Sequence, residues 1–62
     1  MTMRQIRAKI TDWDVSHKSV YVMVSNNNVR RVTLIGRKWV RVLSNAGQFE
    51  FIAPAEVVEI MM

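Results

Sequence analysis

The stretch VRRVTLIGRKWVRVL, residues 29–43, indicates the fold of this 62-residue chain. Apolar residues alternate with polar ones on both sides of Gly36, which predicts two β-strands over residues 29–35 and 39–43. Trp39 follows two basic residues, and the stretch contains five of the nine basic residues. These five are Arg30, Arg31, Arg37, Lys38 and Arg41. The sequence therefore predicts a positively charged β-hairpin that carries one tryptophan.

The length of the loop at Gly36 sets which side chains share a face, because facing residues on paired strands lie on the same side of a sheet. A three-residue loop, 36–38, pairs Val32 with Val42 and keeps apolar and polar side chains on separate faces. Its outward set is Arg31, Thr33, Trp39 and Arg41. A two-residue turn over 36–37 also suits glycine, but it mixes apolar and charged residues on both faces. We favour the three-residue loop.

Period-two alternation predicts further strands on both sides of the hairpin. They cover residues 4–11, 18–25 and 48–52. Pro54 has no N–H for a strand ladder and suits the first position of a helical turn, so one 3₁₀ turn is expected there. A last short strand is expected over residues 57–60.

Turn-forming residues separate these strands. Asparagine tolerates the left-handed backbone region, so the run of three at residues 26–28 predicts a hairpin loop. Residues 44–47 predict a second turn, with Gly47 at a positive φ. The Asp-Trp-Asp sequence at residues 12–14 predicts a turn in which aspartate side chains accept hydrogen bonds from backbone N–H groups. We expect Trp13 to pack over one end of the core.

This order of elements resembles the SH3-like barrel, an architecture in which a 3₁₀ turn commonly precedes the last strand. The resemblance implies an all-β fold, a small barrel of five to six short antiparallel strands, and a single domain over residues 1–62. An OB-type barrel is the alternative, but it usually needs more chain and a helix between strands. The expected core is Ile6, Ile10, Val20, Val22, Val24, Val32, Leu34, Val40, Val42, Phe49, Phe51, Val58 and Ile60.

Composition and charge narrow the classes of function. The net charge of +4 and the pI near 10.4 favour acidic partners such as nucleic acid. No apolar run approaches the ~20 residues of a membrane span, and the N-terminal stretch lacks the apolar centre of a signal peptide. We therefore expect a cytoplasmic protein that does not bind a membrane.

The sequence offers little for catalysis. It has no cysteine and no glycine-rich phosphate loop, and His17, the one histidine, lies in a polar stretch. Asp12 and Asp14 supply too few oxygen ligands to make a metal site by themselves. We expect a protein that is not an enzyme and that needs no metal or cofactor.

The basic hairpin predicts a nucleic-acid-binding module, for RNA or DNA, that binds through a basic and aromatic strand face. Bases stack on aromatic rings, and basic side chains contact phosphates. The candidate residues are Arg31, Arg37, Lys38, Trp39 and Arg41, extended by Arg7 and Lys9 if their strand lies alongside.

A protein-interaction module remains the alternative function. Such an inhibitor or adaptor, of the kind that mobile genetic elements often encode, would dock the hairpin on an acidic protein surface or add a strand to its partner. Edge strands or the apolar tail Ile60-Met61-Met62 would also support a homo-oligomer.

Overall fold

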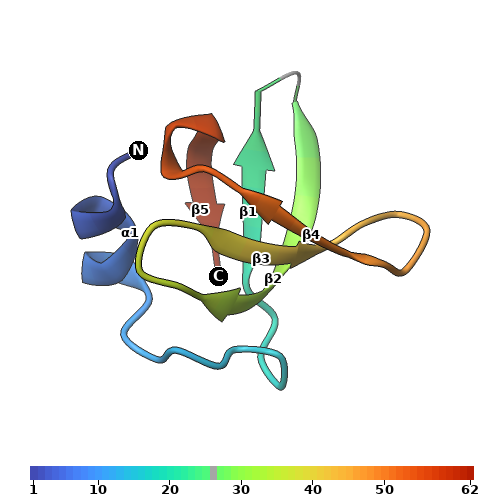
Figure 1. The fold of residues 1–62 in the computed structure, drawn as a ribbon, viewed down its shortest axis with the longest axis horizontal. Coiled ribbons are helices and arrows are strands. Elements are labelled where there is room, and N and C mark those ends of the chain that lie inside the picture. Colours follow the sequence, from blue (N-terminus) through green and yellow to red (C-terminus); the bar gives the residue numbers. More distant parts are fainter. Residues whose placement is uncertain (26) are drawn as a thin grey trace.

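Five β-strands form one antiparallel sheet with the order β4-β3-β2-β1-β5 (Figure 1). The computed structural model describes residues 1–25 and 27–62. The strands are β1 (Tyr21–Val24), β2 (Asn28–Ile35), β3 (Val40–Leu43), β4 (Phe49–Ile52) and β5 (Val57–Met61). A 3₁₀ turn, η1 (Pro54–Glu56), precedes β5, and one α-helix, α1 (Met3–Lys9), precedes the sheet. The prediction of five to six short antiparallel strands is confirmed with five, and so is the 3₁₀ turn before the last strand.

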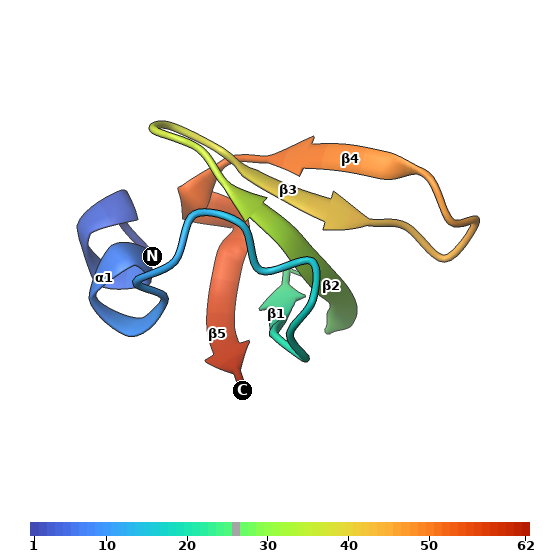
Figure 2. The same ribbon diagram turned by 90° about the horizontal axis from the view of Figure 1, so that it is seen from below.

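The sheet is open, with β4 and β5 as its two edges, so a closed SH3-like barrel is not confirmed. The first half of β2 pairs with β1, and the second half pairs with β3. Figure 2 shows β2 crossing the fold and joining the β3–β4 layer to the β1–β5 layer. The concave space between these two layers holds the core.

The strand expected over residues 4–11 is wrong, because a helix occupies most of this segment. The backbone N–H of Gln5 donates to Thr2 Oγ1 (3.2 Å), and the N–H of Thr2 donates to Gln5 Oε1 (2.9 Å). This reciprocal capping box satisfies two N–H groups at the helix start. Residues four apart lie on one face of a helix as well as on one face of a strand, so Ile6 and Ile10 are buried as expected.

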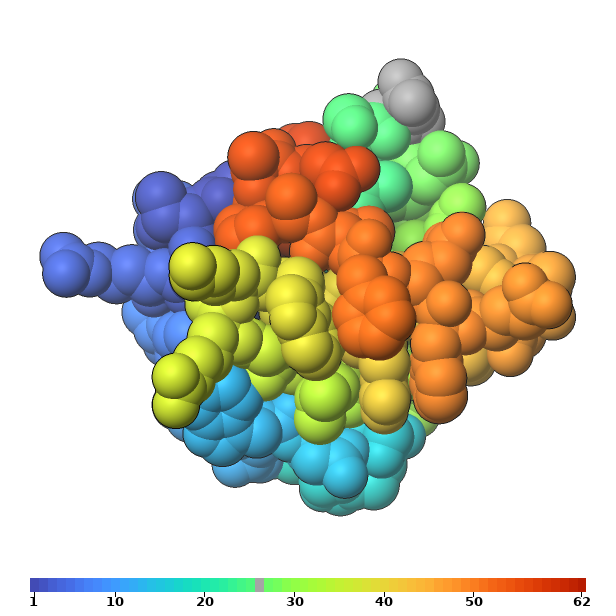
Figure 3. Space-filling model, viewed as in Figure 1, coloured from blue at the N-terminus to red at the C-terminus, as the bar shows by residue number. Residues whose placement is uncertain are grey.

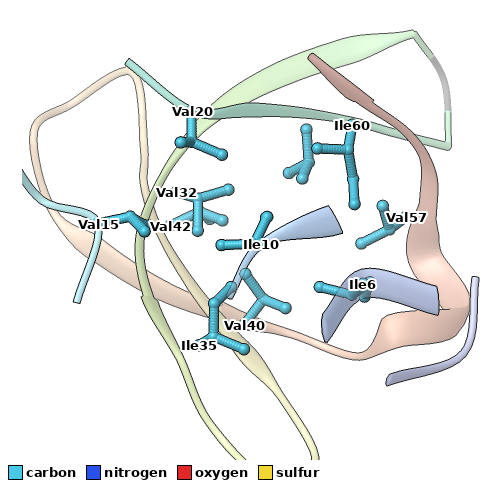
Figure 4. Packing of buried hydrophobic residues seen from close by; sticks show 11 residues of the cluster. Ile6, Ile10, Val15, Val20, Val32, Ile35, Val40, Val42, Val57 and Ile60 are labelled. Carbon is cyan, nitrogen blue, oxygen red and sulfur yellow. The ribbon is translucent and has the colours of Figure 1, made fainter. Parts of the chain in front are cut away.

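Eleven apolar residues of the described chain form the core cluster (Figure 4). They are Ile6, Ile10, Val15, Val20, Val22, Val32, Ile35, Val40, Val42, Val57 and Ile60. Eight of these were predicted, whereas Val15, Ile35 and Val57 were not. Val24 and Leu34 are only partly buried. Phe49, Phe51 and Val58 are exposed, so their assignment to the core is wrong.

Both predicted loops of the β2–β3 hairpin are wrong. The N–H of Gly36 donates to the carbonyl oxygen of Trp39 (2.9 Å), so the loop consists of Arg37 and Lys38 alone. Ile35 therefore pairs with Val40. The register then shifts at Thr33, and beyond this bulge Val32 pairs with Val42, as the three-residue loop predicts. The bulge explains why Ile35, rather than Leu34, enters the core.

The predicted turn chemistry is largely confirmed. Asn27 has φ 61° and Gly47 has φ 80°, both in the left-handed region. Asn26 lies outside the described residues. Asp14 Oδ1 accepts hydrogen bonds from the backbone N–H (3.0 Å) and the hydroxyl (2.6 Å) of Ser16. Trp13 does not pack over the core as expected, since half of its surface is exposed.

Candidate nucleic-acid interface

The face of β2, β3 and β4 that points away from the core carries aromatic and basic side chains; we call it the outer face. Alternation along β3 buries Val40 and Val42 and leaves Arg41 on the outer face. Its principal residues are Leu34, Trp39, Arg41, Leu43, Phe49 and Phe51. Figure 3 looks onto this face, where β4 side chains (orange) lie beside those of the β2–β3 turn and β3 (yellow). It is therefore an accessible surface.

The register of β3 and β4 places two phenylalanines on this face. Arg41 pairs with Phe51, and Leu43 pairs with Phe49, so both rings project on the side of the sheet opposite Val40 and Val42. Phe49 is 57% exposed and Phe51 is 63% exposed. Glu50, between them in sequence, points to the other side of the sheet because side chains alternate.

Trp39 lies flat against Gly36. A Cβ atom on residue 36 would approach the indole atoms Cδ2, Cε2 and Cε3 to 2.7–2.8 Å, so only glycine leaves room for this ring. The indole also packs against Phe51, with ring centroids 4.8 Å apart and ring planes at 84°. Trp39 remains 37% exposed, so it contributes to the surface and is absent from the core cluster.

Arg41 is held between the aromatic rings and the β2 bulge. Its Nε donates to Thr33 Oγ1 (3.0 Å), and the Thr33 hydroxyl donates to the Arg41 carbonyl oxygen (3.1 Å). Its guanidinium carbon lies 4.1 Å from the centroid of the Phe49 ring, a cation–π geometry. The bulge thus fixes a positive charge on the outer face, beside Phe49.

Arg37 and Lys38 form the β2–β3 turn, and both are exposed. Figures 1 and 2 both show α1 beside this turn, so the helix that carries Arg7 and Lys9 lies at the same end of the molecule. The Arg7 guanidinium stacks 3.5 Å from the centroid of the Trp13 ring. The predicted residues Arg7 and Lys9 therefore lie on a helix and not on a strand, and Lys9 lines a second hollow with Asp12 and Lys18 rather than the outer face.

Arg31 is used differently from the other predicted residues. Its Nη2 donates to the carbonyl oxygens of Ser16 (3.2 Å) and Lys18 (3.0 Å). These bonds fasten the loop before β1 to β2. The guanidinium of Arg31 is therefore held by these two hydrogen bonds, and it would have to break them to turn toward a ligand.

The acidic side chains lie mostly away from the outer face. Arg30 and Glu50 approach to 3.9 Å and, with Glu56, line a cleft of about 310 Å³ that runs from β1 to β4, where Phe51 also borders it. Asp14 lies at the margin of the outer face, where its backbone forms an isolated antiparallel β-bridge with Leu34. Asp12 forms an ion pair with Lys18.

The two aspartates of the loop are stabilised in their charged form. The hydrogen bond from Lys18 lowers the pKa of Asp12 below its ordinary value of 3.8. The hydroxyl and backbone N–H of Ser16 lower the pKa of Asp14 in the same direction. Both carboxylates are therefore ionised at neutral pH.

The sequence predicted that Trp39 and Arg41 lie on the outer face, but it assigned Phe49 and Phe51, which also lie there, to the core. Comparisons with protein-family models, curated proteins and solved structures returned no match. No helix in residues 1–25 and 27–62 is long and apolar enough to cross a membrane. Within the same residues, histidine, cysteine and carboxylate side chains form no cluster of three that could hold a metal ion.

Proposed function

We propose that this chain is a small non-enzymatic module that binds nucleic acid through its outer face. The observation that carries the proposal is the arrangement of Trp39, Phe49 and Phe51 around Arg41 on one exposed strand face. Exposed aromatic groups of this kind usually mark a binding surface, because they leave apolar area in water. Bases stack on such rings with about 1–3 kcal/mol each, whatever the base.

Charge supports the same partner. Arg37 and Lys38 are exposed at one end of the outer face, and Arg41 lies within it. The chain carries a net charge of +4, while Glu50 and Glu56 line the cleft rather than this face. Phosphates attract such a surface by counterion release, which gives affinity without sequence preference.

A second candidate function rests on the free edge of β4. Among residues 1–25 and 27–62, this strand pairs with β3 on one side only, so its other side offers N–H and C=O groups for strand addition. A protein partner, or a second copy of this chain, would then extend the sheet. The exposed phenylalanines of β4 are compatible with this use.

A salt series with a fluorescent oligonucleotide tests the proposal. We expect binding at ~50 mM salt that weakens steeply as salt rises. Lys38→Ala should weaken binding and reduce the slope of log K against log salt by about 0.7, the value for one phosphate contact on a single strand.

Arg30→Ala is the matched control, because it also removes one positive charge but from the side that faces the cleft. It should change the affinity by less than about twofold. Equal effects of the two substitutions would show that the binding surface lies elsewhere. No binding at ~50 mM salt would overturn the nucleic-acid proposal and leave strand addition to β4 as the candidate.

A further inference from the structure

We infer that the outer face selects unpaired bases, so that its ligand is single-stranded RNA or DNA rather than a duplex. The inference rests on the proposed function and names its ligand. It assigns Phe49 and Phe51 as stacking residues for two neighbouring bases, with Trp39 as the side wall of the second position. Arg41 lies where it can meet the phosphate that links the two bases.

The spacing of the two phenylalanines carries this inference. They are two residues apart on β4 and project on one face. A strand rises about 3.3–3.4 Å per residue, so the two rings lie about 6.7 Å apart along it. Bases in a duplex follow each other every 3.4 Å, which is half that distance. Neighbouring bases can therefore occupy both rings only where the strand is unstacked.

The orientation of the rings supports the same ligand. The indole of Trp39 is perpendicular to the ring of Phe51, so the two form a corner. Because one face of the indole is packed on Gly36, this wall is held in place before a ligand arrives. The guanidinium of Arg41 covers one face of Phe49, and the exposed remainder of that ring is open to a base. Bases in a duplex keep their flat faces stacked and out of reach of such a corner.

Abasic oligonucleotides separate stacking from charge. The probes are a 12-nucleotide single strand, the same strand with two adjacent abasic positions at its centre, the same strand with every position abasic, and a duplex of the same sequence. Both abasic strands keep every phosphate; one loses two bases and the other loses all of them. We expect the intact strand to bind about tenfold or more tightly than the duplex and than the fully abasic strand. Two central abasic positions should cause a smaller loss, because the protein can shift along the strand.

Variants of β4 locate the effect. Phe49→Leu and Phe51→Leu keep an apolar side chain and remove the aromatic ring, so each should weaken single-strand binding by about fivefold or more. Neither should change duplex binding by more than about twofold. Phe51→Tyr keeps the ring and should bind the single strand as the parent protein does. Far-UV circular dichroism checks that each variant is folded.

The outcomes distinguish the inference from the function on which it rests. Salt-dependent binding that is equal for intact, abasic and duplex probes would overturn the inference and leave the nucleic-acid function standing on charge alone. Tighter binding of the duplex would also overturn it. No binding of any probe at ~50 mM salt would overturn the proposed function itself.

Discussion

The two faces of the β2–β3–β4 sheet are built from different residues. The face toward the core is lined by isoleucine and valine, and the whole core cluster consists of these two residue types. All five aromatic residues of the chain, Trp13, Tyr21, Trp39, Phe49 and Phe51, are exposed instead. Small domains usually bury their largest apolar side chains, because these bury the most area. In β3 and β4 and the turn before them, the buried valines and the exposed rings of Trp39, Phe49 and Phe51 therefore lie on opposite sides of the sheet.

The largest loss of stability is expected when a side chain on the core-facing side of the sheet is truncated. Ile35 is fully buried, so Ile35→Ala should cost about 3 kcal/mol of the free energy of unfolding. A domain this small has only about 3–5 kcal/mol available, so much of the variant should be unfolded. Ile35→Val should cost about 1 kcal/mol and stay folded, so its free energy of unfolding can be measured by urea denaturation.

Phe51→Ala is the control on the outer face. It removes a larger side chain, yet that side chain is mostly exposed, so the cost should be about 1 kcal/mol or less. A cost for Phe51→Ala equal to that of Ile35→Ala would contradict the separation of the two faces.

A smaller loss of stability is expected for Gly36→Ala, which tests how Trp39 is held on the outer face. The new Cβ would collide with the indole ring and displace it from the outer face, at a cost of about 1 kcal/mol. The emission of Trp39, recorded in a Trp13→Phe background, should shift toward that of a solvated indole. Gly47→Ala is the control, because Gly47 has positive φ but no atom near a Cβ. An emission shift of the same size in Gly47→Ala would contradict this account of Trp39.

The smallest effect is expected in the stability of the protein at acid pH, through Asp12 and Asp14 in the segment before β1. Asp12 and Asp14 have pKa values below 3.8 in the folded protein, so their stabilising contribution is present above the unfolded pKa. It is lost as the pH falls through the lowered, folded pKa. Urea midpoints of the parent protein should therefore decline below about pH 4. The double variant Asp12→Asn/Asp14→Asn should show a shallower decline, and an equally steep one would contradict the assignment.

Local signals in the sequence were sufficient for most of the sheet. Asparagine and glycine favour a left-handed backbone at turns, and Asn27 and Gly47 adopt it. Pro54 favours the start of a helical turn, and it begins the 3₁₀ turn before the last strand. The helix also had a local signal, the spacing of Thr2 and Gln5 in a capping box. The alternation of apolar and polar residues in this segment also fits a strand, because Ile6 and Ile10 lie on one face in a helix and in a strand alike. The helix was therefore mistaken for a strand.

The outer face depended on register, which is harder to obtain from sequence. Ser44 N–H donates to the carbonyl oxygen of Gln48, so the β3–β4 loop has three residues and ends on Gly47. Glycine in the left-handed conformation at the end of a three-residue loop is a known hairpin signal, and it would have turned Phe49 and Phe51 outward. The bulge at Thr33 had no such signal, since Val15, remote in sequence, bonds its carbonyl oxygen.

Two-dimensional ¹⁵N–¹H NMR maps directly where a single-stranded oligonucleotide contacts the folded protein at low salt. We expect the largest chemical-shift changes at the Trp39 indole and at the backbone amides of β3, β4 and the β2–β3 turn. The amides that line the cleft outside β4, those of Val24, Ser25, Asn28, Arg30 and Glu56, should change little. The largest changes at these five amides, or no changes at all, would contradict the assignment of the outer face as the binding surface.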